Sequence, residues 1–130
     1  MEQAVEWFIA ITALIVGLSH CLRPADWVTV FRQLHALGRP GAFVSGGLNL
    51  VPGAAIVAGH PSWAWPGAIL TGFGWLLVLK GFVSFLAPDK ALRSMDREGR
   101  SASEFIFAGV LLLVIGAWAY YCIWSRSVHA

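Results

Sequence analysis

The sequence predicts an all-α integral membrane protein, a four-helix bundle made of two parallel repeats of span, interfacial helix and span. Three observations predict it: four long apolar segments, basic residues confined largely to two connections, and a Gly and Pro pattern that the two halves share. Of the 130 residues, 58% are hydrophobic and 12% are charged, about half the charged share of a soluble domain. This composition excludes a disordered chain and argues against a water-soluble domain.

The four apolar segments have the length that a membrane-spanning helix needs. They cover residues 5–22, 42–59, 64–87 and 105–124, and about 17–25 apolar residues cross a bilayer as a helix. The alternative, a soluble bundle of buried helices, requires a polar face on each helix, and these segments lack one. The first segment follows the acidic start Met1-Glu2-Gln3, so we expect it to stay as a helix rather than to be a cleaved signal.

The basic residues predict the orientation of the spans. Seven of the nine Lys and Arg lie in connections 23–40 and 88–104. The positive-inside rule places both connections in the cytoplasm and both termini outside. Most Trp and Tyr residues then collect at the outer interface, as an aromatic belt does. These residues are Trp7, Trp63, Trp65, Trp118, Tyr120, Tyr121 and Trp124.

Both cytoplasmic connections carry apolar residues at helical spacing after a proline. Trp27, Phe31 and Leu34 follow Pro24, and a weaker pattern follows Pro88. Proline is well suited to the first turn of a helix, so we predict interfacial helices over 24–37 and 88–98. The alternative in each case is a solvated turn in which the spacing arises by chance.

The two halves of the chain show an internal repeat. Gly17 and Pro24 correspond to Gly81 and Pro88 at an offset of 64 residues, and segment 46–54 matches segment 109–117 at six of nine positions. Because each half crosses the membrane twice, the two copies would be related by an axis along the membrane normal. Chance matching among Gly, Ala, Leu and Val is the alternative.

Lys80 and Asn49 are the main candidate site residues, because polar and ionisable groups inside a span are rare. Each lies eight residues from the cytoplasmic end of its span, a depth of about 12 Å. The hypothesis is a binding pocket that opens to the cytoplasm. Alternatively, Lys80 extends its stem to the headgroups or pairs with Glu104.

Three further polar residues lie about 5–7 Å deep on the same side: His20, Ser45 and Ser84. His20 could carry protons or bind a metal, although no second ligand stands at a suitable spacing, and a hydrogen-bonded residue at the helix end is the alternative. His60 precedes Pro61 in a short outer turn, where we expect it to be solvated. The carboxylates of Glu2 and Glu6 are expected to lie outside.

Several functional classes find no support in the sequence. It contains no phosphate-binding glycine loop, nucleophile elbow or metal-ligand motif. The basic residues are explained by topology and do not indicate nucleic-acid binding. Cys21 and Cys122 are assigned to opposite membrane faces, which excludes a disulfide between them. Catalytic residues, metal and cofactor are therefore all expected to be absent.

The positions of Gly17, Pro24-Ala25-Asp26-Trp27, Gly46-Gly47, Gly53 and the stretch 75–88 resemble those of small four-span bacterial inner-membrane proteins of unknown function. Each half also resembles a short two-span family. The four-span outline is distantly similar to DoxX-like proteins, some of which are membrane subunits of quinone-linked oxidoreductases. Asn49 stands where that resemblance implies an acidic residue.

These observations predict a non-enzymatic protein of the bacterial inner (plasma) membrane, an accessory or self-associating subunit. Its partners would be the lipid bilayer and either a second copy or another membrane protein. One alternative is a small-molecule carrier or channel that uses the region of Asn49 and Lys80. Another is a membrane subunit of a quinone-linked redox complex.

Overall fold

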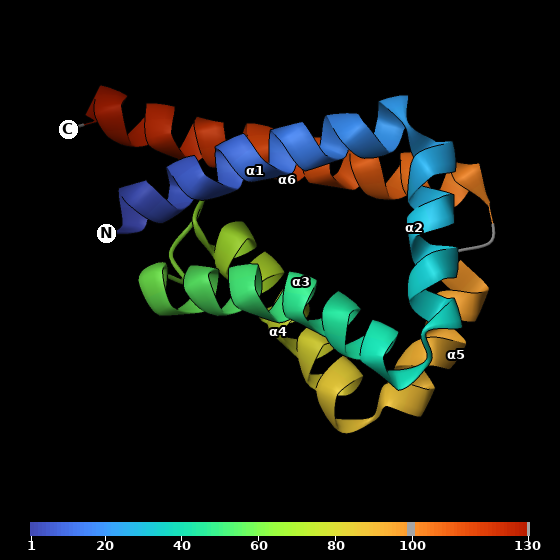
Figure 1. Cartoon of the computed structure of the whole chain (residues 1–130). Helices are drawn as coiled ribbons and strands as arrows, with labels where there is room; N and C mark the ends of the chain where they lie inside the picture. The colour runs from blue at the N-terminus through green and yellow to red at the C-terminus, as the bar shows by residue number, and fades with distance from the viewer. Residues whose placement is uncertain (99–100, 130) are drawn as a thin grey trace.

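A computed structural model describes residues 1–98 and 101–129, and this part of the chain is helical without strands. Four helices are long and apolar enough to cross a membrane, which confirms the predicted all-α class with four candidate spans. They are α1 (Glu2–Leu22), α3 (Arg39–Gly59), α4 (Ala68–Leu86) and α6 (Ala102–His129), and the shorter helices are α2 (Pro24–Ala36) and α5 (Pro88–Glu98) (Figure 1).

Prolines set the boundaries between the long and the short helices. α2 begins at Pro24 and α5 at Pro88, each directly after a residue with a non-helical backbone, Arg23 (φ −131°, ψ 52°) and Ala87 (φ −134°, ψ 65°). The proline ring disfavours a helical conformation in the preceding residue. The chain therefore turns at Arg23 and Ala87, and each short helix starts in a new direction.

The helix boundaries differ most from the predicted spans at the start of α4 and at the end of α6. α4 begins at Ala68, four residues after the predicted start at residue 64, because the preceding residues form a non-helical link. α6 is longer than predicted and extends from Ala102 to His129. Polar residues near its ends remain helical, although hydropathy alone does not include them in the span.

The long helices pack as two antiparallel pairs, α1 with α6 and α3 with α4 (Figure 1). We call each pair a hairpin, although α1 and α6 are the first and last helices of the chain. Small residues allow close approach in both pairs. A Cβ atom added at Gly17 of α1 would lie 2.9 Å from the carbonyl oxygen of Gly109 in α6. One added at Gly46 of α3 would lie 2.7 Å from Cβ of Ser84 in α4. Glycine at these positions lets the backbones meet, as in other membrane helix pairs.

The two hairpins are joined at both ends of the molecule. At the end that carries the chain termini and the 60–67 link, here called the terminal end, one apolar core contains residues from all four long helices. Its buried members are Ile9, Ala10, Ala13, Ile56, Leu70, Ala119 and Cys122. At the opposite end, the connector end, α2 and α5 lie across the hairpins and contact each other (Figure 1).

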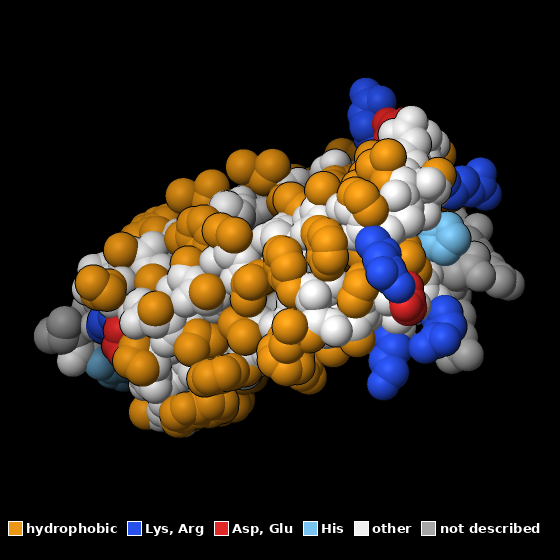
Figure 2. All heavy atoms as spheres, turned by 60° about the horizontal axis from the view of Figure 1, so that its bottom comes forward, with side chains coloured by type: hydrophobic (Ala, Val, Ile, Leu, Met, Phe, Trp, Pro, Cys, Tyr) orange, Lys and Arg blue, Asp and Glu red, His pale blue; other side chains and the backbone are white. Residues whose placement is uncertain are grey.

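The outer surface of the long helices is apolar. Figure 2 shows hydrophobic side chains over the body of the molecule, and Lys and Arg side chains gathered at the connector end. Only 28–33% of the residues in each candidate span are buried within the chain. The remaining apolar faces need lipid or another protein to cover them, because water solvates such a surface poorly.

Candidate functional site

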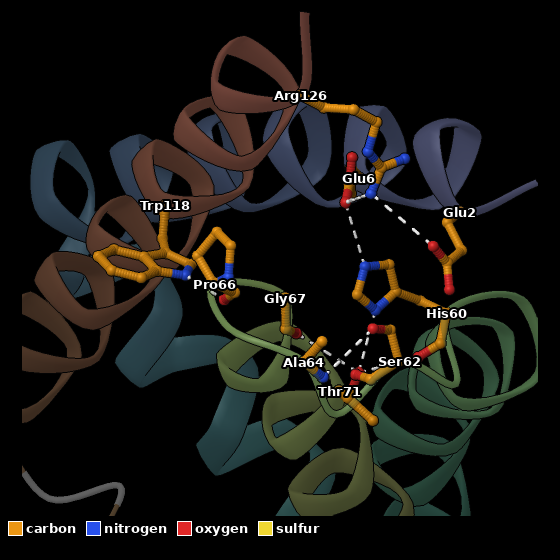
Figure 3. A network of polar contacts seen from close by, with 10 residues as sticks. All are labelled: Glu2, Glu6, His60, Ser62, Ala64, Pro66, Gly67, Thr71, Trp118 and Arg126. Atoms are coloured by element: carbon orange, nitrogen blue, oxygen red, sulfur yellow. Dashed lines mark hydrogen bonds and ion pairs between the residues drawn. The ribbon is translucent and has the colours of Figure 1, made fainter. Parts of the chain in front are cut away.

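A buried carboxylate and a buried imidazole meet at the terminal end. Nε2 of His60 lies 3.1 Å from Oε1 of Glu6, and both side chains are fully buried. Glu6 comes from the second turn of α1, and His60 is the residue that directly follows α3. The contact therefore joins the two hairpins across 54 positions of sequence (Figure 3).

Thr71, at the start of α4, holds the other side of the imidazole. Its hydroxyl oxygen lies 3.0 Å from Nδ1 of His60, 2.9 Å from the carbonyl oxygen of His60 and 2.6 Å from that of Ser62. A hydroxyl has one proton, and a separation of 2.6 Å between hydroxyl and carbonyl oxygens requires that proton between them. Thr71 therefore donates to Ser62 and accepts a hydrogen bond from Nδ1–H of His60.

Arg126 of α6 completes the group with a charge-assisted hydrogen bond. Its Nη2 donates to Oε1 of Glu6 over 2.7 Å and lies 3.8 Å from Oε2 of Glu2. The Arg126 and Glu2 side chains are 46% and 39% exposed, so they connect the buried Glu6 with the surface. We call Glu2, Glu6, His60, Thr71 and Arg126 the terminal polar cluster.

One polar atom of the cluster is left without a partner. Oε2 of Glu6 is buried and accepts no hydrogen bond from the residues that the structure describes. A buried acceptor without a partner costs about 1–3 kcal/mol, and more when it is charged. Within the cluster, Oε1 of Glu6 therefore has two hydrogen-bond partners, His60 and Arg126, and Oε2 has none.

The 60–67 link is fixed to both hairpins by hydrogen bonds. The Thr71 hydroxyl lies within reach of carbonyl oxygens of the link, and Nε1 of Trp118 in α6 donates to the carbonyl oxygen of Pro66 over 2.9 Å. The Trp118 ring also packs edge-on against Trp65, with 5.2 Å between the ring centroids. These contacts place His60 under the link, where water does not reach it (Figure 3).

The structure places the predicted residues Asn49, Ser45, Ser84 and Lys80 on the α3/α4 hairpin. Nδ2 of Asn49 donates to the carbonyl oxygen of Ser45 over 2.9 Å, and the Ser84 hydroxyl donates to that of Lys80 over 3.0 Å. Both are bonds within one helix. Lys80 is exposed, and in the described part of the chain neither Asn49 nor Glu104 forms a hydrogen bond or ion pair with it.

His20 lies on the other hairpin and makes local contacts. Its Nδ1 lies 2.8 Å from the carbonyl oxygen of Val16, one turn earlier in α1. The ring stacks on Trp27 of α2 at a centroid distance of 4.1 Å, and Nε1 of Trp27 donates to Ser19. His20 is thus a buried residue at the joint between α1 and α2.

The expectation that His60 is solvated is wrong, since none of its side chain is exposed. The Glu6 side chain is also fully buried within the bundle. The sequence favours a solvated His60 because this residue stands in a short link next to the end of a predicted span. A signal was present in the sequence: the acidic Glu6 is followed directly by the apolar run of α1, and an acid at such a position needs a partner.

The length and composition of the four long helices fit a multi-pass membrane protein. The described residues include no group of three or more His, Cys, Asp or Glu side chains arranged to hold a metal ion. Comparison with known protein families, with curated proteins and with solved structures gives no significant match.

Proposed function

We propose that the protein is a non-enzymatic subunit of a membrane assembly, formed with further copies of itself or with another membrane protein. The observation that carries the proposal is how the buried polar groups are used. Oε1 of Glu6, both ring nitrogens of His60 and the Thr71 hydroxyl all bond to one another or to the chain. These bonds hold helices together, and the buried Thr71 hydroxyl beside the imidazole donates its proton to the carbonyl oxygen of Ser62, so it is not placed as a nucleophile for His60 to activate.

We also propose the finer placement that the sequence predicts: the inner (plasma) membrane of a bacterium, with α2 and α5 on the cytoplasmic side and both termini outside. The gathering of Lys and Arg at the connector end supports it. So do the aromatic pairs at the terminal end, where Trp7 packs against Tyr120, and Trp118 and Trp124 both pack against Tyr121.

Equivalent contacts in the two hairpins support the proposed internal repeat. A Cβ at Gly46 would meet Ser84 and Phe85, and a Cβ at Gly109 would meet His20 and Cys21. These partners are 64 positions apart in sequence, and the two glycines are 63 apart, the offsets found from the sequence. The α1/α6 and α4/α3 pairs then correspond under one two-fold operation.

Native mass spectrometry of the protein released from mild detergent tests the proposed function. We expect a persistent oligomer or a stoichiometric membrane-protein partner, without a bound small molecule. A monomer that carries a metabolite would overturn the proposal and favour a carrier. A co-purifying quinone would favour a subunit of a quinone-linked redox complex, the class that the DoxX-like resemblance implies.

A small-molecule carrier is the second candidate, and the arrangement of the hairpins favours it. The buried core that contains all four long helices lies toward the terminal end. The contacts of α1 with α3 and of α4 with α6 are sparse beside those within each hairpin. Two rigid units joined in this way could rock against each other, which is how many carriers alternate access.

A further inference from the structure

We propose that Glu6 and His60 form a binding site for one exchangeable proton, and that this proton makes or breaks the direct bond between their side chains, which adds to the apolar core in holding the two hairpins together at the terminal end. The inference concerns what the cluster binds and stands independently of the proposed membrane assembly. It follows from counting the protons that the hydrogen-bond geometry requires.

The proton on Nδ1 of His60 is used in the hydrogen bond to the Thr71 hydroxyl. The Thr71 hydroxyl proton lies on the 2.6 Å line to the carbonyl oxygen of Ser62, so its oxygen acts only as an acceptor toward the ring, 3.0 Å away. A neutral imidazole has one N–H group. If Nδ1 holds it, Nε2 presents a bare lone pair to Glu6.

The contact between Nε2 of His60 and Oε1 of Glu6 therefore depends on one additional proton. Two lone pairs facing each other at 3.1 Å repel, whereas one proton between these atoms makes a hydrogen bond. Arg126 donates to the same oxygen over 2.7 Å, so this oxygen is an acceptor toward both neighbours and the added proton is the Nε2–H group of the ring. The linked state is an imidazolium beside a carboxylate.

The charges that face the pair come from the elements packed around it. α1 supplies Glu2, and α6 supplies Arg126 and, one turn earlier, the thiol of Cys122. α4 supplies the hydroxyl of Thr71. With the proton bound, the positive charges of His60 and Arg126 balance the negative charges of Glu6 and Glu2.

Loss of the proton breaks the Glu6–His60 bond and leaves the other bonds of the terminal polar cluster in place. Glu6 and Arg126 both belong to the α1/α6 hairpin, whereas His60 and Thr71 both belong to the α3/α4 hairpin. The ion pair and the threonine bond therefore survive, and only the Glu6–His60 contact breaks. The partly exposed side chains of Arg126 and Glu2 give the proton a short polar route to the surface.

Two substitutions at His60 isolate the effect. His60→Gln places an amide N–H near the position of Nε2, so it keeps a donor toward Glu6 that pH does not remove. His60→Asn places its amide near Nδ1, so it keeps the bond to Thr71 and lacks the link at every pH. His35→Asn is the control, since His35 is exposed on α2 at the connector end.

The experiment compares unfolding of these four proteins in detergent micelles between pH 5.5 and 9, with side-chain ¹⁵N NMR of His60 in the wild type. Relative to His60→Gln, we expect the wild-type unfolding constant to rise about tenfold as pH increases, while His60→Asn shows no comparable step. The NMR spectrum should show Nε2 losing its proton over the same range while Nδ1 keeps its own.

Parallel pH profiles of the wild type and His60→Gln would overturn the proposal. A His60 ring whose protonation stays constant from pH 5.5 to 9 would overturn it as well. The NMR measurement uses the unmodified protein, so it decides the question even if a substituted chain fails to fold.

Discussion

At the scale of single residues, the terminal polar cluster shows how a few side chains satisfy one another in an apolar bundle. Oε1 of Glu6 lies within hydrogen-bond distance of both His60 and Arg126, and the Thr71 hydroxyl lies between the His60 ring and a carbonyl oxygen of the link. Buried polar groups are costly unless they are paired. Removing one side chain of the cluster would therefore leave its neighbour in the hydrogen-bond series buried without a partner.

Replacing Thr71 with Val should destabilise the protein by about 1–3 kcal/mol, because it leaves the Nδ1–H group of His60 and a link carbonyl oxygen without their partner. Reversible unfolding in mixed micelles would measure the loss. Thr12→Val is the matched control, since the Thr12 hydroxyl is exposed and donates only to Phe8 of its own helix. Equal effects of the two substitutions would contradict the role given to Thr71.

Replacing Lys80 or Asn49 singly with Leu should leave membrane insertion and the oligomer intact. Lys80 is exposed, and Asn49 bonds to its own helix through the carbonyl oxygen of Ser45. Insertion assays and native mass spectrometry would check this outcome. If either substitution removed a bound small molecule that the wild type carries, the carrier with a pocket at Asn49 and Lys80 would become the better interpretation.

At the scale of helices, close packing of glycine faces sets the two hairpins. Gly17 and Gly109 bring α1 onto α6, and Gly46 and Gly81 bring α3 onto α4. In lipid, helix association depends on such close contacts because apolar surface is not driven together there as it is in water. The glycines at these four positions thus pack helices of the same chain against each other.

Two neighbouring glycines provide a test of this packing. Gly46→Ala should destabilise the α3/α4 hairpin by about 1–3 kcal/mol, because its Cβ would lie 2.7 Å from that of Ser84. Gly47→Ala should be neutral or slightly stabilising, since nothing lies within 4 Å of the added atom and alanine favours the helix. Micelle unfolding compares the two, and a larger loss at Gly47 would show that the helix faces are assigned incorrectly.

At the scale of the whole molecule, the two hairpins meet through an apolar core at the terminal end and through α2 and α5 at the connector end. The ion pair of Arg39 with Asp89 ties the start of α3 to the start of α5 over 3.2 Å. Both side chains are largely exposed, so this pair contributes little stability. The arrangement leaves most residues of each candidate span outside the buried core, and the face seen in Figure 2 is largely apolar.

The proposed topology predicts opposite accessibility of the two ends. Single cysteines at residues 32 and 93, in a background without Cys21 and Cys122, should react with a membrane-impermeant thiol reagent only from the cytoplasmic side. A cysteine at residue 127 should react only from outside. Labelling intact and inverted vesicles would measure this, and reaction of residues 32 and 93 from different sides would refute a shared cytoplasmic connector end.

The sequence by itself determined the class of fold, the four candidate spans and the two connecting helices. These features follow from local properties, namely apolar length, the prolines at 24 and 88, and the distribution of Lys and Arg. Each can be read from a short window of residues. The boundaries near residues 60–67 were less accurate, because hydropathy does not distinguish an apolar link from a helix.

Only the tertiary structure decided that Glu6 meets His60. The two residues are 54 positions apart, and they come together because α1 pairs with α6 and α3 with α4, which places the end of α3 beside the start of α1. Burial of a side chain depends on which other segments cover it, and the 60–67 link covers His60. Local composition could therefore predict where the helices run, whereas the contact between a carboxylate and an imidazole required the packing of all four.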